Sequence, residues 1–176
     1  MTTQKFSSYK ARALKGLAPI PGDKSISHRA LMFGGLAIGE TIIHGLLEGE
    51  DCLHTADAMR AMGADIQNID GIWHCHGVGI GGLTEPEDVL EMGNSGTSTR
   101  LLMGLVGGHH ITATFTGDAS LNKRPMGRVI KPLEQMGVKC TAQEGGKLPL
   151  TLQGPEDTLN IEYCLLYTSP SPRDRG

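Results

Sequence analysis

The sequence predicts an α/β fold in which a unit of roughly seventy residues occurs twice. The clearest internal match aligns Arg29-Ala-Leu-Met with Arg100-Leu-Leu-Met, and another aligns the Met-Gly pair at 62–63 with the pair at 136–137. In each copy a turn and a segment of strand character follow, at 71–76 and at 147–152. A period of this length indicates a duplicated supersecondary structure and suits a βαβαββ unit better than a pair of helices.

Composition fits a globular core and a small anionic ligand. The 176 residues are 39% hydrophobic and 20% charged but only 4% aromatic, so we expect an aliphatic core rich in methionine. The formal net charge of −3 argues against a general affinity for nucleic acid and makes the basic motifs local features. No apolar run reaches the length of a membrane span, and the first residues lack the apolar stretch of a signal peptide.

The first basic motif lies at the start of a predicted helix. Pro21-Gly22 is typical of a turn, and Asp23 or Ser25 can cap the helix that follows. Lys24 then stands at a helix N-terminus, where free backbone N–H groups and the helix dipole favour an anion, and Arg29 follows one turn later. The alternative is a capped surface helix with solvated cations. The segment 34–41 (GGLAIGET) is expected to end this helix at a glycine before a strand at 41–44.

Two further basic segments resemble the first in design. Residues 93–100 (GNSGTSTR) lead with glycine, serine and threonine into an apolar helix. Residues 122–128 (NKRPMGR) precede an amphipathic helix, and Pro125 suits a position at or before its first turn. Arg124 can bind a carboxylate or phosphate through two parallel hydrogen bonds, whereas Lys123 is expected to be solvated. Three helix starts of this kind favour a phosphate- or carboxylate-bearing ligand.

The cysteines, the His-Cys-His segment and a glycine-rich segment do not indicate a functional site. No Cys-x-x-Cys pair occurs among the four cysteines, which are Cys52, Cys75, Cys140 and Cys164. We therefore expect reduced thiols in a cytoplasmic protein and no metal site. In a strand, His74 and His76 share one face and Cys75 the other, which argues against a joint metal site. Residues 77–82 match Gly-x-Gly-x-x-Gly, but Pro86 follows where a dinucleotide fingerprint needs a helix.

Three segments together resemble the 5-enolpyruvylshikimate-3-phosphate synthase (EPSP synthase) family: 21–29 (PGDKSISHR), 93–100 (GNSGTSTR) and 117–128 (GDASLNKRPMGR). They occur in the family's order and spacing, and the resemblance covers roughly residues 14–163. It implies transfer of the enolpyruvyl group from phosphoenolpyruvate to the 5-hydroxyl of shikimate 3-phosphate, with release of phosphate, on the route to chorismate and the aromatic amino acids. It implies no cofactor, no obligatory metal and a monomer without nucleic-acid or membrane partners.

The resemblance also implies roles for single residues. Lys24, Ser25 and Arg29 are expected to hold shikimate 3-phosphate. Phosphoenolpyruvate, and the inhibitor glyphosate that competes with it, is expected to contact Lys24, Gly96 and Arg124, with Lys24 taking part in catalysis. Lesser roles in lining or supporting the same loop are expected for Asn94, Thr97 and Arg100.

Family members have two domains, each with three βαβαββ units around buried parallel helices in an inside-out α/β barrel. The resemblance therefore implies a partial domain. We expect residues 1–20 to belong with the other domain, 21–163 to form about two of three units, and 164–176 to be a non-native tail of translated vector sequence. The carboxylate base is expected in the other half of the family's chain, so the isolated chain is expected to be inactive.

Two alternatives remain open. A related family transfers enolpyruvate to UDP-N-acetylglucosamine, with Lys-Asn in its first motif and a catalytic cysteine on a mobile loop. This sequence has Lys24-Ser25 instead and no cysteine close to Arg124. The other alternative is a non-catalytic module that binds anions.

Overall fold

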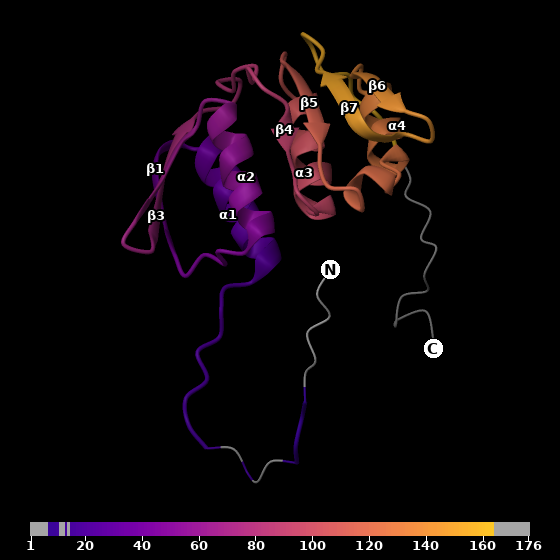
Figure 1. Cartoon of the computed structure of the whole chain (residues 1–176). Coiled ribbons are helices and arrows are strands. Elements are labelled where there is room, and N and C mark those ends of the chain that lie inside the picture. The colour runs from indigo at the N-terminus through magenta and orange to yellow at the C-terminus, as the bar shows by residue number, and fades with distance from the viewer. Residues whose placement is uncertain (1–6, 11–12, 14, 164–176) are drawn as a thin grey trace, which may run out of the picture.

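The computed structural model describes residues 7–10, 13 and 15–163, and its order of elements confirms the predicted repeat (Figure 1). The first unit contains α1 (Lys24–Leu36), β1 (Ile38–His44), α2 (Glu50–Ala61), β2 (Asp65–Ile69) and β3 (Ile72–Val78). The second contains β4 (Leu90–Glu91), α3 (Gly96–Gly107), β5 (Thr112–Thr116), the 3-10 turn η1 (Leu121–Lys123), α4 (Gly127–Gln135), β6 (Lys139–Gln143) and β7 (Lys147–Gln153).

The two sheets repeat one topology. The first has the strand order β1-β3-β2, and the second has β4-β5-β7-β6, so β1, β2 and β3 correspond to β5, β6 and β7. All pairs are antiparallel except β4 with β5. The second unit is a complete βαβαββ block. Among the described residues no strand precedes α1, so the first unit matches this block from its first helix onward.

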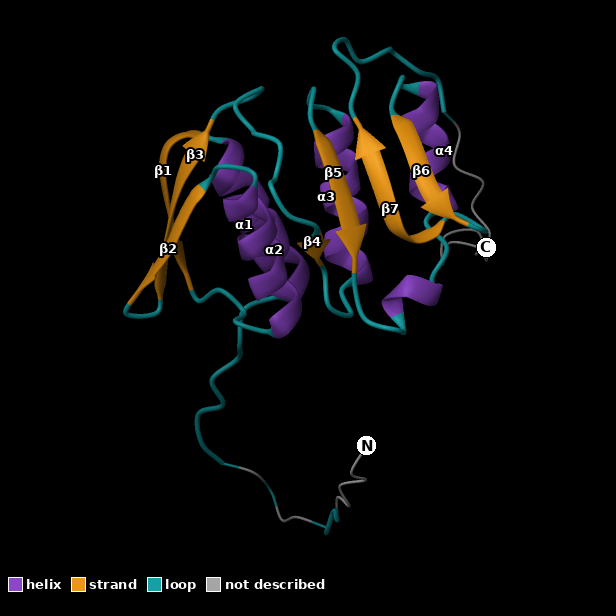
Figure 2. Ribbon diagram, turned by 45° about the horizontal axis from the view of Figure 1, so that its top comes forward, coloured by secondary structure: helices purple, strands orange, loops and turns teal. Residues whose placement is uncertain are grey.

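Each sheet carries its pair of helices on one face (Figure 2), with α1 and α2 on the first sheet and α3 and α4 on the second. The core of the first unit includes Leu31, Met59 and Cys75, and that of the second includes Leu102 and Phe115, all fully buried. The aliphatic, methionine-rich core that the composition predicts is confirmed by a set of fully buried methionines: Met59, Met62, Met92, Met103 and Met126.

Strand β3 alternates as expected. Trp73 and Cys75 are buried against the helices, whereas His74 and His76 lie on the opposite face. His74 Nδ1 is 2.7 Å from Glu40 Oε1 on β1, so this imidazole has a carboxylate partner. In the part of the chain that the structure describes, no group of three or more histidine, cysteine or acidic side chains is arranged to hold a metal ion.

The prediction that the first helix ends at a glycine is wrong. α1 continues through Gly34 and Gly35 to Leu36, and β1 begins at Ile38 rather than at 41. A Cβ on Gly34 would lie 3.0 Å from the Cβ of Cys75, and one on Gly35 would lie 2.6 Å from the Cε of Met59. These glycines therefore let α1 pack closely against β3 and α2 and do not end the helix.

Segments outside the two units are described only in part. Of residues 1–20, the described ones are exposed and form no helix or strand, and their association with a second domain stays a prediction. The expected tail at 164–176 lies outside the described residues. None of the helices in the described ranges is long and apolar enough to cross a membrane.

Candidate anion-binding site

The start of α1 places Lys24 beside α2. Asp23 is the N-cap of α1, and its side chain accepts a hydrogen bond of 2.8 Å from the amide of Ile26, so the structure selects Asp23 over Ser25 as the cap. Lys24 is the first residue of the helix, and its ammonium forms an ion pair with Asp51 in the first turn of α2. The Lys24 side chain is 51% exposed, so it remains accessible to a ligand.

Arg29 and Arg100 make equivalent contacts in the two units. Arg29 Nη1 donates to the carbonyl of Ser25 at 2.9 Å, and Arg100 Nη1 donates to the carbonyl of Gly96 at 3.0 Å. Each guanidinium is thus held along the first turn of its own helix. A guanidinium has five N–H donors, so one such contact leaves donors for an anion. The shared geometry confirms the internal alignment of Arg29 with Arg100.

Gly96 lies against two guanidinium groups at the start of α3. Ser95 caps this helix by accepting a 3.2 Å hydrogen bond from the amide of Ser98. A Cβ on Gly96 would lie 2.7 Å from Arg100 Nη1 and 3.1 Å from Arg124 Nη1. The space beside this glycine is therefore the place where both arginines and the positive end of the helix dipole meet.

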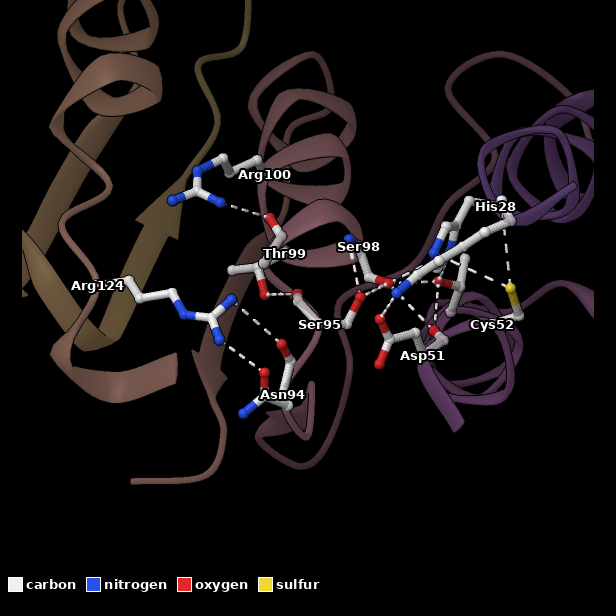
Figure 3. Close-up of polar contacts among 12 residues, drawn as sticks. His28, Asp51, Cys52, Asn94, Ser95, Ser98, Thr99, Arg100 and Arg124 are labelled. Carbon is white, nitrogen blue, oxygen red and sulfur yellow. Dashed lines mark hydrogen bonds and ion pairs between the residues drawn. The ribbon is translucent and has the colours of Figure 1, made fainter. Parts of the chain in front are cut away.

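Asn94 holds Arg124 in place. Figure 3 shows the hydrogen bond of 2.6 Å that Arg124 Nη2 donates to Asn94 Oδ1. Arg124 Nη2 also donates to Ser120 Oγ at 3.2 Å, and Asn94 Nδ2 donates to Asp118 Oδ2 at 2.6 Å. The hydrogen bond from Asn94 lowers the pKa of Asp118, and the backbone amide of Leu121 and the charge of Arg124 act in the same direction. Asp118 thus stays ionised and fixes the amide orientation that suits Arg124.

The predicted residues border separate hollows. Arg100 and Arg124 line one of about 880 Å³ together with other residues of the second unit: Pro125, Gly127, Arg128, Lys131 and Tyr163. This lining has four cationic side chains and no acidic one. Lys24 lines a smaller hollow of about 260 Å³ with Glu50 and Asp51. Arg29 borders a third, largely apolar hollow of about 350 Å³ between α1 and α3.

The two halves meet through Asp51. Its carboxylate pairs with Lys24, and its backbone carbonyl accepts a 3.1 Å hydrogen bond from Ser98 Oγ on α3. The starts of α1, α2 and α3 therefore lie side by side. Ser25 and Thr97 are exposed in the first turns of α1 and α3, where a ligand can reach them. Helix starts that carry arginine and lysine side chains are suited to phosphate or carboxylate groups.

Sequence reasoning missed the acidic partners of the site. No role was predicted for Asp51 or Asp118, yet they orient Lys24 and Asn94. Sequence reasoning also missed the buried side chains that connect the helices, because these residues are far apart in the sequence.

Known proteins similar to this chain share its motifs and its fold. The family model described as EPSP synthase (3-phosphoshikimate 1-carboxyvinyltransferase) matches residues 9–169. A relative from Novosphingobium aromaticivorans, named 3-phosphoshikimate 1-carboxyvinyltransferase, is 67% identical over 157 residues, which are 89% of this chain and 36% of that protein. A relative of the same name from Zymomonas mobilis is 60% identical over 163 residues, covering 92% of this chain and 36% of the relative.

Solved structures agree with the sequence relatives. An EPSP synthase from Acinetobacter baumannii superposes with a TM-score of 0.81 at 47% identity, over 86% of this chain and 35% of that one. The chain spans little more than a third of the length of the relatives it matches.

Proposed function

Because the chain belongs to the EPSP synthase family, we propose that the whole protein transfers the enolpyruvyl group of phosphoenolpyruvate to the 5-hydroxyl of shikimate 3-phosphate and releases phosphate. This chain supplies part of the site for both substrates. The observation that carries the proposal is the meeting of Gly96 with the guanidinium groups of Arg100 and Arg124 at the start of α3.

Phosphoenolpyruvate suits the second unit. Its phosphate and carboxylate match the two guanidinium groups beside Gly96, since arginine binds such groups through paired hydrogen bonds. Asn94 holds the Arg124 side chain in its extended position before any ligand arrives. Such preorganisation lowers the entropic cost of binding.

Shikimate 3-phosphate suits the first unit. Lys24 and Ser25 present an ammonium and a hydroxyl at the start of α1, and the Arg29 guanidinium lies along the same turn. The ion pair with Asp51 holds Lys24 at the junction of the two units, where its ammonium can contact the phosphate of one substrate and the enolpyruvyl donor.

The chemistry places a clear demand on these cations. The 5-hydroxyl gives up its proton to a base as its oxygen attacks C2 of phosphoenolpyruvate, while C3 takes a proton. Then the C2–O bond to phosphate breaks, and C3 gives up a proton to restore the double bond. Negative charge accumulates on the departing phosphate. Lys24, Arg100 and Arg124 are fixed cations that stabilise this charge, and holding both substrates in one orientation removes part of the entropic barrier.

The alternatives have less support. In the described residues Cys52 and Cys75 are buried and Cys140 is half-buried on β6, so none of these thiols is presented on a loop beside Arg124. Lys24-Ser25 also differs from the Lys-Asn pair of the UDP-N-acetylglucosamine enzymes. A non-catalytic anion module has no observation in its favour beyond the cations themselves.

We further infer a cytoplasmic monomer that acts on small molecules without a cofactor. Burial raises the pKa of the Cys52 and Cys75 thiols, so they are poorly reactive, and their free state fits a reducing compartment. The local placement of cations on a chain of net charge −3 fits small anionic substrates better than nucleic acid.

A chimera tests the proposal. Residues 9–163 of this chain replace the matching segment of the Novosphingobium aromaticivorans relative, where the identity is 67%. We expect this chimera to restore growth without aromatic amino acids in bacteria that lack their own enzyme, and a Lys24→Met variant to fail. A soluble, folded chimera that does not restore growth would contradict the proposal.

A further inference from the structure

A buried polar cluster joins the two repeat units beside the anion site (Figure 3). It contains His28 of α1, Thr55 of α2, and Ser95 and Ser98 at the start of α3. Each of these residues is at most 1% exposed. Polar side chains are seldom buried so fully unless all of them find partners, so their arrangement calls for an explanation.

Short contacts link the members. His28 Nδ1 is 2.8 Å from Thr55 Oγ1 and 3.3 Å from Ser98 Oγ, and the two hydroxyl oxygens are 2.9 Å apart. Ser95 Oγ is 2.6 Å from Ser98 Oγ. The contacts between His28 and Ser98 and between Thr55 and Ser98 cross from the first unit to the second.

One assignment of protons gives every group a partner. The Cys52 thiol lies 3.9 Å from the Lys24 carbonyl and donates to His28 Nε2 at 4.0 Å. His28 Nδ1–H donates to Thr55 Oγ1 at 2.8 Å, Thr55 Oγ1–H donates to Ser98 Oγ at 2.9 Å, and Ser98 Oγ–H donates to the Asp51 carbonyl at 3.1 Å. Ser95 Oγ–H donates to Ser98 Oγ.

The anion site is divided between the same two units. Lys24 and Arg29 belong to the first unit, whereas Gly96, Arg100 and Arg124 belong to the second. The cluster touches both halves: Cys52 contacts the carbonyl of Lys24, and Ser95 caps the helix that begins with Gly96. Any change in how the units dock would therefore alter the spacing between the cations.

We propose that His28 is a positioning residue that fixes this spacing by joining Thr55 of the first unit to Ser98 of the second. The consequence of this contact for catalysis rests on the proposed function, but the contact between the two units through His28 does not. His28 touches no substrate. It acts through the cluster, which sets how far the α1 cations stand from the guanidinium groups at α3.

The surroundings favour a neutral imidazole. His28 faces Lys24 and Arg29 from its own helix and Asp51 and the Cys52 thiol from α2, while α3 presents only hydroxyl groups to it. Burial is the main cause that lowers the pKa of His28, and the two cations act in the same direction, against Asp51. A neutral ring carries one proton, which Nδ1 donates to Thr55 Oγ1.

The 176-residue chain allows a test that does not depend on activity. We expect His28→Ala to speed amide hydrogen exchange at the starts of both α1 and α3. His28→Asn should restore slow exchange, because a side-chain atom of asparagine lies as many bonds from Cα as Nδ1 does. Leu150→Ala, which removes a fully buried side chain from β7, is the control matched for loss of thermal stability. If His28→Ala speeds exchange only at α1, or if Leu150→Ala shows the same pattern, the contact through His28 does not fix the docking of the two units.

The chimera supplies the catalytic readout. We expect His28→Ala and Ser98→Ala each to lower kcat/KM by up to about 100-fold, as misplaced site residues do, with non-additive losses in the double variant. His28→Asn should recover most of the activity. Additive losses, or a loss no larger than in Leu150→Ala, would overturn the positioning role. If the exchange pattern holds but the unmodified chimera has no activity, His28 does connect the two units and the proposed function is wrong.

Discussion

Arg29 and Arg100 are each held by the carbonyl of the residue four positions earlier, so both guanidinium groups lie along a helix start. Arg124 is held by the carbonyl and side chain of Asn94 and by the Ser120 hydroxyl. At the scale of the residue, the site is thus a set of cations whose directions are set before a ligand binds.

The first residue prediction concerns Arg29. In the chimera, Arg29→Ala should weaken shikimate 3-phosphate binding by about 2–5 kcal/mol, because it removes one charged partner of an ion contact that becomes desolvated. Titration calorimetry measures the loss, and Lys139→Ala, an exposed cation on β6, serves as the control. An Arg29→Ala variant of unchanged affinity would remove Arg29 from the site.

The second residue prediction concerns Gly96. An added methyl group would meet the Arg100 and Arg124 guanidinium groups, so Gly96→Ala should weaken phosphoenolpyruvate and glyphosate binding by about 1–3 kcal/mol, the usual cost of overpacking. Gly104→Ala on the same helix is the matched control, since nothing lies within 4 Å of a Cβ there. Inhibition curves for the two variants should separate, and coincident curves would show that Gly96 is not at the contact.

At the scale of the element, the helices meet through the cluster around His28 as well as through apolar packing. α1, α2 and α3 each contribute to it, and their starts carry the anion site. Burial lowers the pKa of His28, so the docked helices favour the neutral form of this ring.

This lowered pKa predicts a pH effect on stability. The pKa of His28 is lowered in the folded chain from its ordinary value of 6.5, so below that pH the unfolded chain binds more protons than the folded one. The free energy of unfolding should therefore fall as the pH drops from 7 towards 5, and it should fall less steeply in His28→Asn. Urea unfolding across this range measures both slopes, and equal slopes would contradict the neutral, buried imidazole.

Local signals explain which elements could be predicted. The starts of α1 and α3 follow from Asp23 and Ser95, because caps act on amides within three residues. The end of α1 was misplaced, since Gly34 and Gly35 serve close packing against side chains about 25 to 40 residues away in sequence. His28 and Asp51 gained roles only when the helices docked, and no local pattern reveals such contacts.

At the scale of the whole molecule, an apolar strip runs along α1 and α3. Phe33 is 66% exposed and Ile26 is 68% exposed, and the hollow between the helices is lined by Met32, Leu36, Leu101 and Leu105 among others. Repeat units bury such faces against a neighbouring unit. The chain as printed offers no described element to cover this one.

We therefore predict that the 176-residue chain self-associates through this strip. Sedimentation velocity should show larger species as concentration rises, and Phe33→Ser should shift the chain towards monomer. Ile80→Ser, in an exposed turn after β3, is the control and should change little. A chain that stays monomeric at high concentration would show that the strip does not mediate association.

The most direct measurement of the central claim is phosphate release by the purified chimera. Our account predicts turnover comparable to that of the Novosphingobium aromaticivorans relative, dependent on both shikimate 3-phosphate and phosphoenolpyruvate and abolished by Lys24→Met. It predicts no turnover by the 176-residue chain alone, because the carboxylate base is expected in the other half of the family's chain. A folded chimera without turnover would contradict the assignment of the site, and turnover by the isolated chain would contradict the division of the site between two halves of a longer protein.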